Sequence, residues 1–259
     1  MAIGRLVMVF LLALVLMGGA AAQDEEKAPP TAPIEEEAPP EGPSSATEET
    51  APPTPTVPPT ATPTPASRAG DILLADNFDD PSAGVMARSS ETPTLFQYGY
   101  DGGEYVMRRI SPEATGNVTV PLPGTFADSV IAVDARIVGE TSQRLVALQC
   151  RRIGGPDQQQ YRFEVSPDRG AYRLLRFIDG AMTPFPDWTP APAIQRGNAV
   201  NRLELRCAGS TIAVRANGVS LVSAEDPALR EGRLAITAGV LERRLLIEAR
   251  FDNLVVSQP

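Results

Sequence analysis

The sequence predicts an all-β domain over residues 69–259, folded as a two-sheet sandwich. Apolar and polar residues alternate with a period of two along most of this segment, and turn-forming residues separate the alternating runs at short intervals. No long window shows the 3.6-residue period of an amphipathic helix. We count about a dozen short strands, more than one sheet of ordinary size holds, which favours a sandwich.

The alternation is clearest in residues 144–152, where Val146, Leu148 and Cys150 share one face of the expected strand. The same pattern recurs in four further segments, at residues 161–165, 203–207, 212–216 and 245–251. The dipeptide Asn217-Gly218 is the strongest hairpin signal, because both residues tolerate the positive φ of a type I′ turn. We therefore expect a tight hairpin at this point.

The first 22 residues have the pattern of an export signal. Arg5 precedes an apolar run of 12 residues, Leu6–Met17, and the small residues that follow end in an A-x-A motif at 20–22. The run is short for a transmembrane helix, which needs roughly 20 apolar residues. We expect a cleaved signal peptide and a secreted or extracytoplasmic, surface-associated protein. The alternative is an uncleaved signal that anchors the chain in a membrane.

Residues 23–68 have the composition of a disordered tether. Thirteen of these 46 residues are Pro, eight are Thr and nine are acidic, and Ile34 and Val57 are the sizeable apolar residues. Such a segment buries too little apolar surface to offset the entropy of ordering it. The Thr-Pro steps between Thr54 and Pro65 resemble an O-glycosylated stalk, and a plain spacer is the alternative.

The composition excludes several chemistries. The chain has no His, so a Ser-His-Asp triad and a His-ligated zinc site are both ruled out. Its one lysine, Lys27, lies in the tether, so the domain has no lysine for a Schiff base. Residues 69–259 hold 20 Arg and 23 acidic residues without a strongly basic run, so we expect no nucleic-acid partner.

The two cysteines, Cys150 and Cys207, lie 57 positions apart on the apolar faces of their expected strands. An exported protein meets an oxidising environment, which favours a disulfide. Neighbouring strands would bring the two Cα atoms to the ~5.5 Å that a disulfide requires. The alternative is a pair of buried free thiols that act as small apolar residues.

Five short motifs carry a resemblance to a known group of proteins. They are Asp76–Asp80 (DNFDD), Tyr100–Tyr105 (YDGGEY), Tyr161–Tyr172, Asn201–Gly218 and Phe251–Val256 (FDNLVV). Their order and spacing resemble the concanavalin A-like lectin/glucanase superfamily. Within it, the chain is most similar to LamG-like and 3-keto-disaccharide-hydrolase-like domains of exported bacterial proteins, over about residues 71–257. The resemblance implies a jelly roll that binds or processes glycans.

The chain also departs from that pattern. Many members have Gly-Trp after the first motif, whereas Gly84 here is followed by Val-Met, and the glucanase motif Glu-x-Asp-x-x-Glu is absent. Retaining glycosidases need two carboxyl groups ~5.5 Å apart. Glu164 and Glu204 would form such a pair if their strands were neighbours. The alternative is that both form cross-strand ion pairs with arginines such as Arg162 and Arg206 on a solvated face.

Two further groups of residues are candidates for binding. Trp188, the only Trp, lies in a proline-rich loop and would either stack on a sugar ring or close the edge of the core. The resemblance also implies a structural Ca²⁺ site formed by Asp252 with backbone carbonyls of Asp79 and Gly102, since Ca²⁺ takes oxygen ligands. The alternative is that Asp252 caps a turn.

Two functions of different classes follow from these observations. The first is a non-catalytic extracytoplasmic binding or sensory module, whose ligand is a glycan or cell-envelope polymer. Its candidate ligand-binding residues are Trp188, Glu164, Glu204 and Arg162. The second is a glycoside-processing hydrolase of the 3-keto-disaccharide-hydrolase-like type. The missing His and the missing paired acids favour the first, with no catalytic residue and no cofactor other than Ca²⁺.

Overall fold

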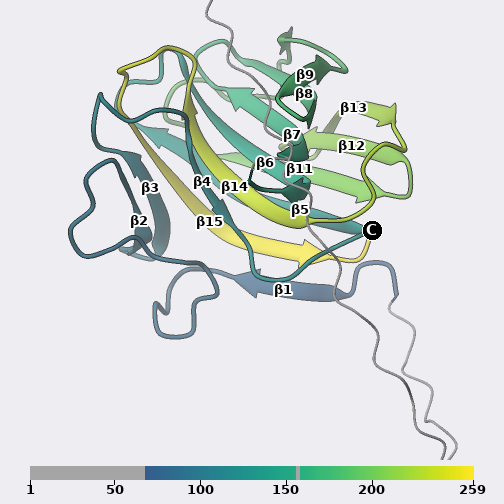
Figure 1. Cartoon of the computed structure of the whole chain (residues 1–259), viewed down its shortest axis with the longest axis horizontal. Helices are drawn as coiled ribbons and strands as arrows, with labels where there is room; N and C mark the ends of the chain where they lie inside the picture. Colours follow the sequence, from purple (N-terminus) through teal and green to yellow (C-terminus); the bar gives the residue numbers. More distant parts are fainter. Residues whose placement is uncertain (1–67, 156–157) are drawn as a thin grey trace, which may run out of the picture. The chain divides into compact units, whose positions relative to one another are not determined.

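The computed structural model describes residues 68–155 and 158–259, which form two antiparallel β-sheets without a helix (Figure 1). The predicted all-β, two-sheet sandwich is therefore confirmed for this part of the chain. The predicted signal peptide and all but the last residue of the predicted tether lie outside the described residues. No helix that could cross a membrane occurs in the two described segments.

Sheet A contains eight strands, with β2 at one edge and β13 at the other (Figure 1). The C-terminal strand β15 is central: β3 and β5 flank it, and β1 pairs with its last residues. The order across the sheet is β13 (Val219–Glu225), β12 (Thr211–Ala216), β11 (Asn201–Ala208), β5 (Ser129–Val138), β15 (Ile247–Ser257), β3 (Glu104–Arg109) and β2 (Phe96–Asp101), with β1 (Ile72–Asp76) beside β15.

Sheet B contains seven strands and forms the second layer. Strand β8 is long enough to pair with both β9 and β10 along different parts of its edge. The order is β10 (Thr189–Pro190), β8 (Ala171–Ile178), β7 (Gln159–Ser166), β6 (Arg144–Ile153), β14 (Arg233–Val240) and β4 (Val118–Pro121), with β9 (Ala181–Pro184) beside β8.

The core lies between the inner faces of the two sheets, as the period-two alternation predicts. Burial alternates along all ten residues of β5, where Ile131, Val133 and Ile137 are fully buried. From sheet B, Leu148 and Phe163 pack into the same apolar cluster. In each strand, the residues that alternate with these buried ones lie on an outer face of the sandwich, where a ligand can reach them.

The Cys150–Cys207 disulfide is present, and its Cα atoms lie 6.7 Å apart. The two strands are not paired within one sheet, because Cys150 lies on β6 of sheet B and Cys207 on β11 of sheet A. Both side chains are buried and point into the core from opposite sides. The bond therefore joins the two sheets across the core.

The predicted hairpin at Asn217-Gly218 connects β12 and β13, with φ angles of 51° and 82°. Both values are positive, as a type I′ turn requires. The Asn217 side chain also accepts a hydrogen bond from the Arg202 amide and donates one to the Ala193 carbonyl, both 2.8 Å long. The turn residue thus also holds the adjoining loop.

Candidate functional site

The outer face of sheet B is polar, yet most of its polar side chains are shielded from solvent. Exposed fractions are 9% or less for six of them: Gln149, Gln160, Arg162, Glu164, Ser166 and Thr237. Polar residues on an outer sheet face are ordinarily exposed. Their burial marks this face as the place where the molecule is hollowed.

A pocket of about 560 Å³ opens at this face, and we refer to it as the sheet pocket. Strands β4, β6 and β7 contribute its polar floor, β8 contributes Phe177, and the edge strand β2 of sheet A contributes two aromatic rings. The principal lining residues are Thr119, Gln149, Arg152, Gln160, Arg162 and Phe177, with Phe96 and Tyr98 from β2. This volume is within the range of small-ligand sites.

The strand registers explain why these side chains meet. Gln149 of β6 is directly opposite Arg162 of β7, and Gln160 of β7 is opposite Phe177 of β8. Directly opposed residues of antiparallel strands point to the same face with Cβ atoms about 5 Å apart. Each pair therefore presents two adjacent side chains to the sheet pocket.

A β-bulge in β6 places Arg152 in the pocket. Paired positions three apart in β6 face partners two apart on both neighbouring strands, so β6 contains one extra residue. Arg151, with a φ of 51°, occupies the bulge, and its buried guanidinium donates to the Ala127 and Leu229 carbonyls. Since the bulge reverses the alternation, Arg152 joins Gln149 on the outer face.

Several buried polar atoms of the sheet pocket have no hydrogen-bond partner among the described residues. The amide of Gln149 donates to the Thr237 hydroxyl at 2.9 Å, but its Oε1 is unpaired. The same holds for Gln160 Oε1, Arg152 Nε and Arg162 Nη2. An unpaired buried polar group costs about 1–3 kcal/mol, so such a cluster is typical of a binding site.

Glu164 is 2% exposed and lies between two arginines. Arg173 donates to its Oε2 at 2.6 Å. The Arg162 Nε lies 2.8 Å from Oε1, close enough for an ion pair, although its N–H does not point at that oxygen. Burial lowers the pKa of Arg162, the Glu164 charge opposes this shift, and the Arg173 charge adds to it. The predicted ion pairing is confirmed, but the predicted solvated face is wrong for Glu164.

Trp188 lies between β9 and β10 and is half-buried. The guanidinium of Arg173 lies 4.6 Å from the centre of its ring, and that of Arg169 lies 5.2 Å away. Because Arg173 also binds Glu164, the candidates Trp188, Glu164 and Arg162 belong to one connected group on sheet B. Trp188 does not line the sheet pocket itself.

Glu204 lies elsewhere, so the possibility that it forms a pair with Glu164 on neighbouring strands is excluded. Glu204 belongs to β11 of sheet A, whereas Glu164 belongs to β7 of sheet B. Both side chains are on outer faces, so the core separates them. Glu204 is directly opposite Arg215 and lies 3.6 Å from its guanidinium, which confirms the predicted cross-strand ion pair.

The residues of the expected Ca²⁺ site lie near one another. Burial raises the pKa of Asp252, and the negative charges of Asp134, Asp79 and Glu104 add to this shift. A Cβ on Gly103, next to Gly102, would lie 3.2 Å from Asp79 Oδ1. The oxygen donors suit Ca²⁺ in kind. However, no group of three acidic residues in the described segments could hold a metal ion, so the site remains a prediction.

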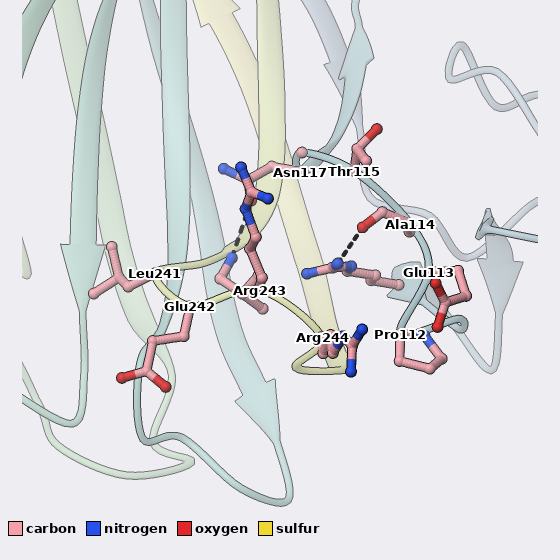
Figure 2. A pocket seen from close by; sticks show the side chains of 12 residues that line it. Pro112, Glu113, Ala114, Thr115, Asn117, Leu241, Glu242, Arg243 and Arg244 are labelled. Carbon is pink, nitrogen blue, oxygen red and sulfur yellow. Dashed lines mark hydrogen bonds between the residues drawn. The ribbon is translucent and has the colours of Figure 1, made fainter. Parts of the chain in front are cut away.

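A second pocket, of about 500 Å³, lies between the β3–β4 and β14–β15 loops, and we refer to it as the end pocket. Figure 2 shows Glu113 on one side of the pocket and Arg243 and Arg244 on the other, with the Glu242 carboxylate pointing away from Glu113. Arg109 lines it and donates to the Ala114 carbonyl. Gly116 and Asn117 line both pockets, so the end pocket adjoins the sheet pocket.

Sequence reasoning missed most of the sheet pocket. Its unassigned residues include Gln149, Arg152, Gln160, Phe96, Tyr98 and Phe177. One signal was visible: Gln149 and Gln160 are uncharged polar residues in strands that are otherwise rich in arginine or apolar residues. The position of Arg152 was not readable, because strict alternation assigns it to the core.

No family model matches the sequence, and no curated protein matches it either. Among solved structures, a β-1,3-1,4-glucanase (lichenase) from a mouse hindgut metagenome is similar, at 10% identity and a TM-score of 0.55, with 72% of this chain and 99% of that chain covered. A Bacillus licheniformis β-glucanase is similar at 9% identity and a TM-score of 0.54, with 74% of this chain and 100% of that chain covered. A Bacillus subtilis protein of unknown function with a galectin-like fold is similar at 16% identity and a TM-score of 0.52, with 74% of this chain and 98% of that chain covered.

Proposed function

We propose that this chain, which has the concanavalin A-like jelly-roll fold, is a non-catalytic extracytoplasmic module that binds a glycan in the sheet pocket. The observation that carries the proposal is the cluster of buried, unpaired polar atoms in that pocket. The Cys150–Cys207 disulfide supports the location, because such bonds persist in oxidising compartments.

The pocket chemistry suits sugar hydroxyls. Gln149 Oε1 and Gln160 Oε1 are acceptors without donors, and a sugar ring presents several hydroxyl donors within a few ångströms. A bound hydroxyl would remove the cost of leaving each amide oxygen unpaired. Both side chains are 1% exposed, so each amide oxygen must turn toward the pocket before a sugar hydroxyl can reach it.

Aromatic rings border these acceptors. Phe177 is directly opposite Gln160, and Phe96 and Tyr98 line the same pocket from β2. All three rings are half-buried, so part of each faces the pocket. An aromatic face packs well against the apolar C–H face of a sugar. The pocket thus combines hydroxyl acceptors and stacking surfaces.

The carboxylates support binding over hydrolysis. A glycosidase of the usual kind needs two carboxyl groups flanking one glycosidic bond. Each oxygen of Glu164 lies against a guanidinium, that of Arg162 or of Arg173. Glu204 is on the other sheet, so the two glutamates cannot act on one bond.

The test is binding of the full-length exported chain to laminarin, dextran, levan and polygalacturonate, measured by affinity electrophoresis and calorimetry. We expect at least one polysaccharide to bind. Gln160→Ala and Phe177→Ala should each weaken it about tenfold, since a lost hydrogen bond or stacking contact is worth roughly 1–2 kcal/mol. Gln195→Ala, outside the pocket, is the matched control. Binding to none of them, or binding unaffected by Gln160→Ala, contradicts the proposal.

The hydrolase alternative is tested in parallel with β-glucans and 3-keto-glycosides, by release of reducing sugar. We expect no turnover. Glu164→Gln is the informative variant, and Glu204→Gln is its control on the other sheet. Turnover by the wild type that Glu164→Gln abolishes, with an unchanged melting temperature, would replace the binding module with an enzyme.

A further inference from the structure

The sheet pocket contains more positive charge than its surroundings balance. Arg152 and Arg233 are directly opposite each other on β6 and β14. The Arg233 guanidinium donates to the Leu122 carbonyl, and neither arginine forms an ion pair within the described segments. Like charges opposite each other destabilise a sheet, so this pair carries a cost in the unliganded protein.

Arg162 extends the same cluster. The pKa of Arg152 is lowered first by burial and then by the positive charges of Arg233 and Arg162, which places the three guanidiniums within electrostatic reach of one another. Arg162 shares the single carboxylate of Glu164 with a fourth arginine, Arg173. The cluster therefore has a positive excess, although residues 69–259 as a whole have more acids than arginines.

The unpaired donors of this cluster lie in the pocket beside the unpaired acceptors. Arg162 is 9% exposed with Nη2 unpaired, and Arg152 has Nε unpaired. Guanidinium N–H groups prefer anionic oxygens, and hydrogen bonds to charged groups are about twice as strong as neutral ones. With Gln149 and Gln160 as hydroxyl acceptors, the pocket matches a sugar that bears an acidic group next to its hydroxyls.

The adjoining end pocket is also lined by more arginines than acidic residues. Arg109, Arg243 and Arg244 line it, against the acids Glu113 and Glu242 (Figure 2). Arg109 is 4% exposed, and its Nε has no partner among the described residues. Since both pockets share Asn117 at their border, a polymer bound in the first reaches the second.

From this arrangement we infer that the ligand of the sheet pocket is an acidic glycan, whose anionic groups contact Arg152 and Arg162 and whose chain continues toward Arg109 in the end pocket. This inference rests on the proposed function and names the ligand class of the same site. The bulge at Arg151 is part of it, because the same sequence in a strand without the bulge would point Arg152 into the core.

The test compares acidic with neutral polysaccharides on the full-length chain. Polygalacturonate supplies carboxylates, dextran sulfate supplies sulfates, and dextran is the neutral reference. We expect at least one acidic polymer to bind about tenfold more tightly than dextran, with affinity falling as salt rises. Arg152→Gln should remove most of the preference for the acidic polymer over dextran, and Arg162→Gln should remove even more of it. Arg206→Gln, on the outer face of sheet A, is the matched control.

The outcomes separate this inference from the proposed function. Equal binding of dextran and the acidic polymers, weakened by Gln160→Ala but not by Arg152→Gln, overturns the inference and leaves the proposed function standing. Binding to no polysaccharide overturns both. If Arg206→Gln weakens binding of the acidic polymer as much as Arg152→Gln does, the binding is non-specific for polyanions and the inference is overturned. The same holds if the wild type binds duplex DNA as tightly as it binds the acidic polysaccharide. Melting temperatures of all variants confirm that each is folded.

Discussion

Removal of the Cys150–Cys207 disulfide is predicted to destabilise the domain by about 4 kcal/mol. The bond closes a loop of 57 residues, and the chain-entropy model gives this value for a loop of that length at 25 °C. For a domain of this size, 1 kcal/mol shifts the melting temperature by roughly 2–4 °C. Reduction should therefore lower it by about 8–16 °C.

The assay is denaturant unfolding of oxidised and reduced wild type, followed by tryptophan fluorescence. Reduction retains both sulfur atoms, so it isolates the crosslink from the cavity that Cys150→Ala and Cys207→Ala together would create. The oxidised protein should also show a smaller m-value, because the bond keeps its unfolded chain more compact. The double variant is the control and should not respond to the reductant. Coincident unfolding curves for the two redox forms would refute the reasoning.

Three further predictions test local features. Gly232→Ala should cost about 1–3 kcal/mol in chemical unfolding and weaken glycan binding, because its Cβ would lie 2.4 Å from the Arg151 carbonyl carbon; wild-type stability would contradict this. Glu104→Gln should cost about 1 kcal/mol at pH 7, because a hydrogen bond from Arg136 is the main cause of the lowered Glu104 pKa. That contribution is present above pH 4.5 and is lost as pH falls through the lowered pKa, so an equal cost at pH 2 argues against it. Burial first, then neighbouring acids, raises the pKa of Asp252, so its stabilising contribution is lost as pH rises above 3.8 through that raised pKa. Asp252→Asn should therefore stabilise the protein at pH 7 in EDTA and abolish any rise in melting temperature that Ca²⁺ gives the wild type; an equal Ca²⁺ response in both would exclude Asp252 as a ligand.

The sequence was sufficient to predict the strands, the Asn217-Gly218 hairpin and the disulfide partners. These features depend on local alternation, turn chemistry and the apolar setting of two cysteines. It was not sufficient to predict which strands share a sheet. Alternation assigns a residue to an inner or outer face, but pairing between β14 and β4, or between β11 and β5, depends on contacts distant in sequence.

The candidate site was predictable only in part, for a related reason. Arg162 and Glu164 were visible as outward residues of one strand; Arg162 lines the pocket, and Glu164 lies beside it, paired with Arg162. Gln149 was assigned to an outer face like many other polar residues, and nothing local shows that this face is hollowed. Arg152 was not predicted as a pocket residue, because the bulge at Arg151, with its positive φ, interrupts the alternation at that point.

The extra residue in β6 also affects how chains with this fold should be aligned. If the equivalent strand of another chain lacks the extra residue and is aligned without a gap, the residue matched with Arg152 lies in the core of that chain. The bulge absorbs Arg151, so losing that residue would leave Arg152 in the pocket and Leu148 and Cys150 in the interior. An alignment of such chains therefore needs a gap at Arg151, so that Arg152 is matched with a residue on the same face of the sheet.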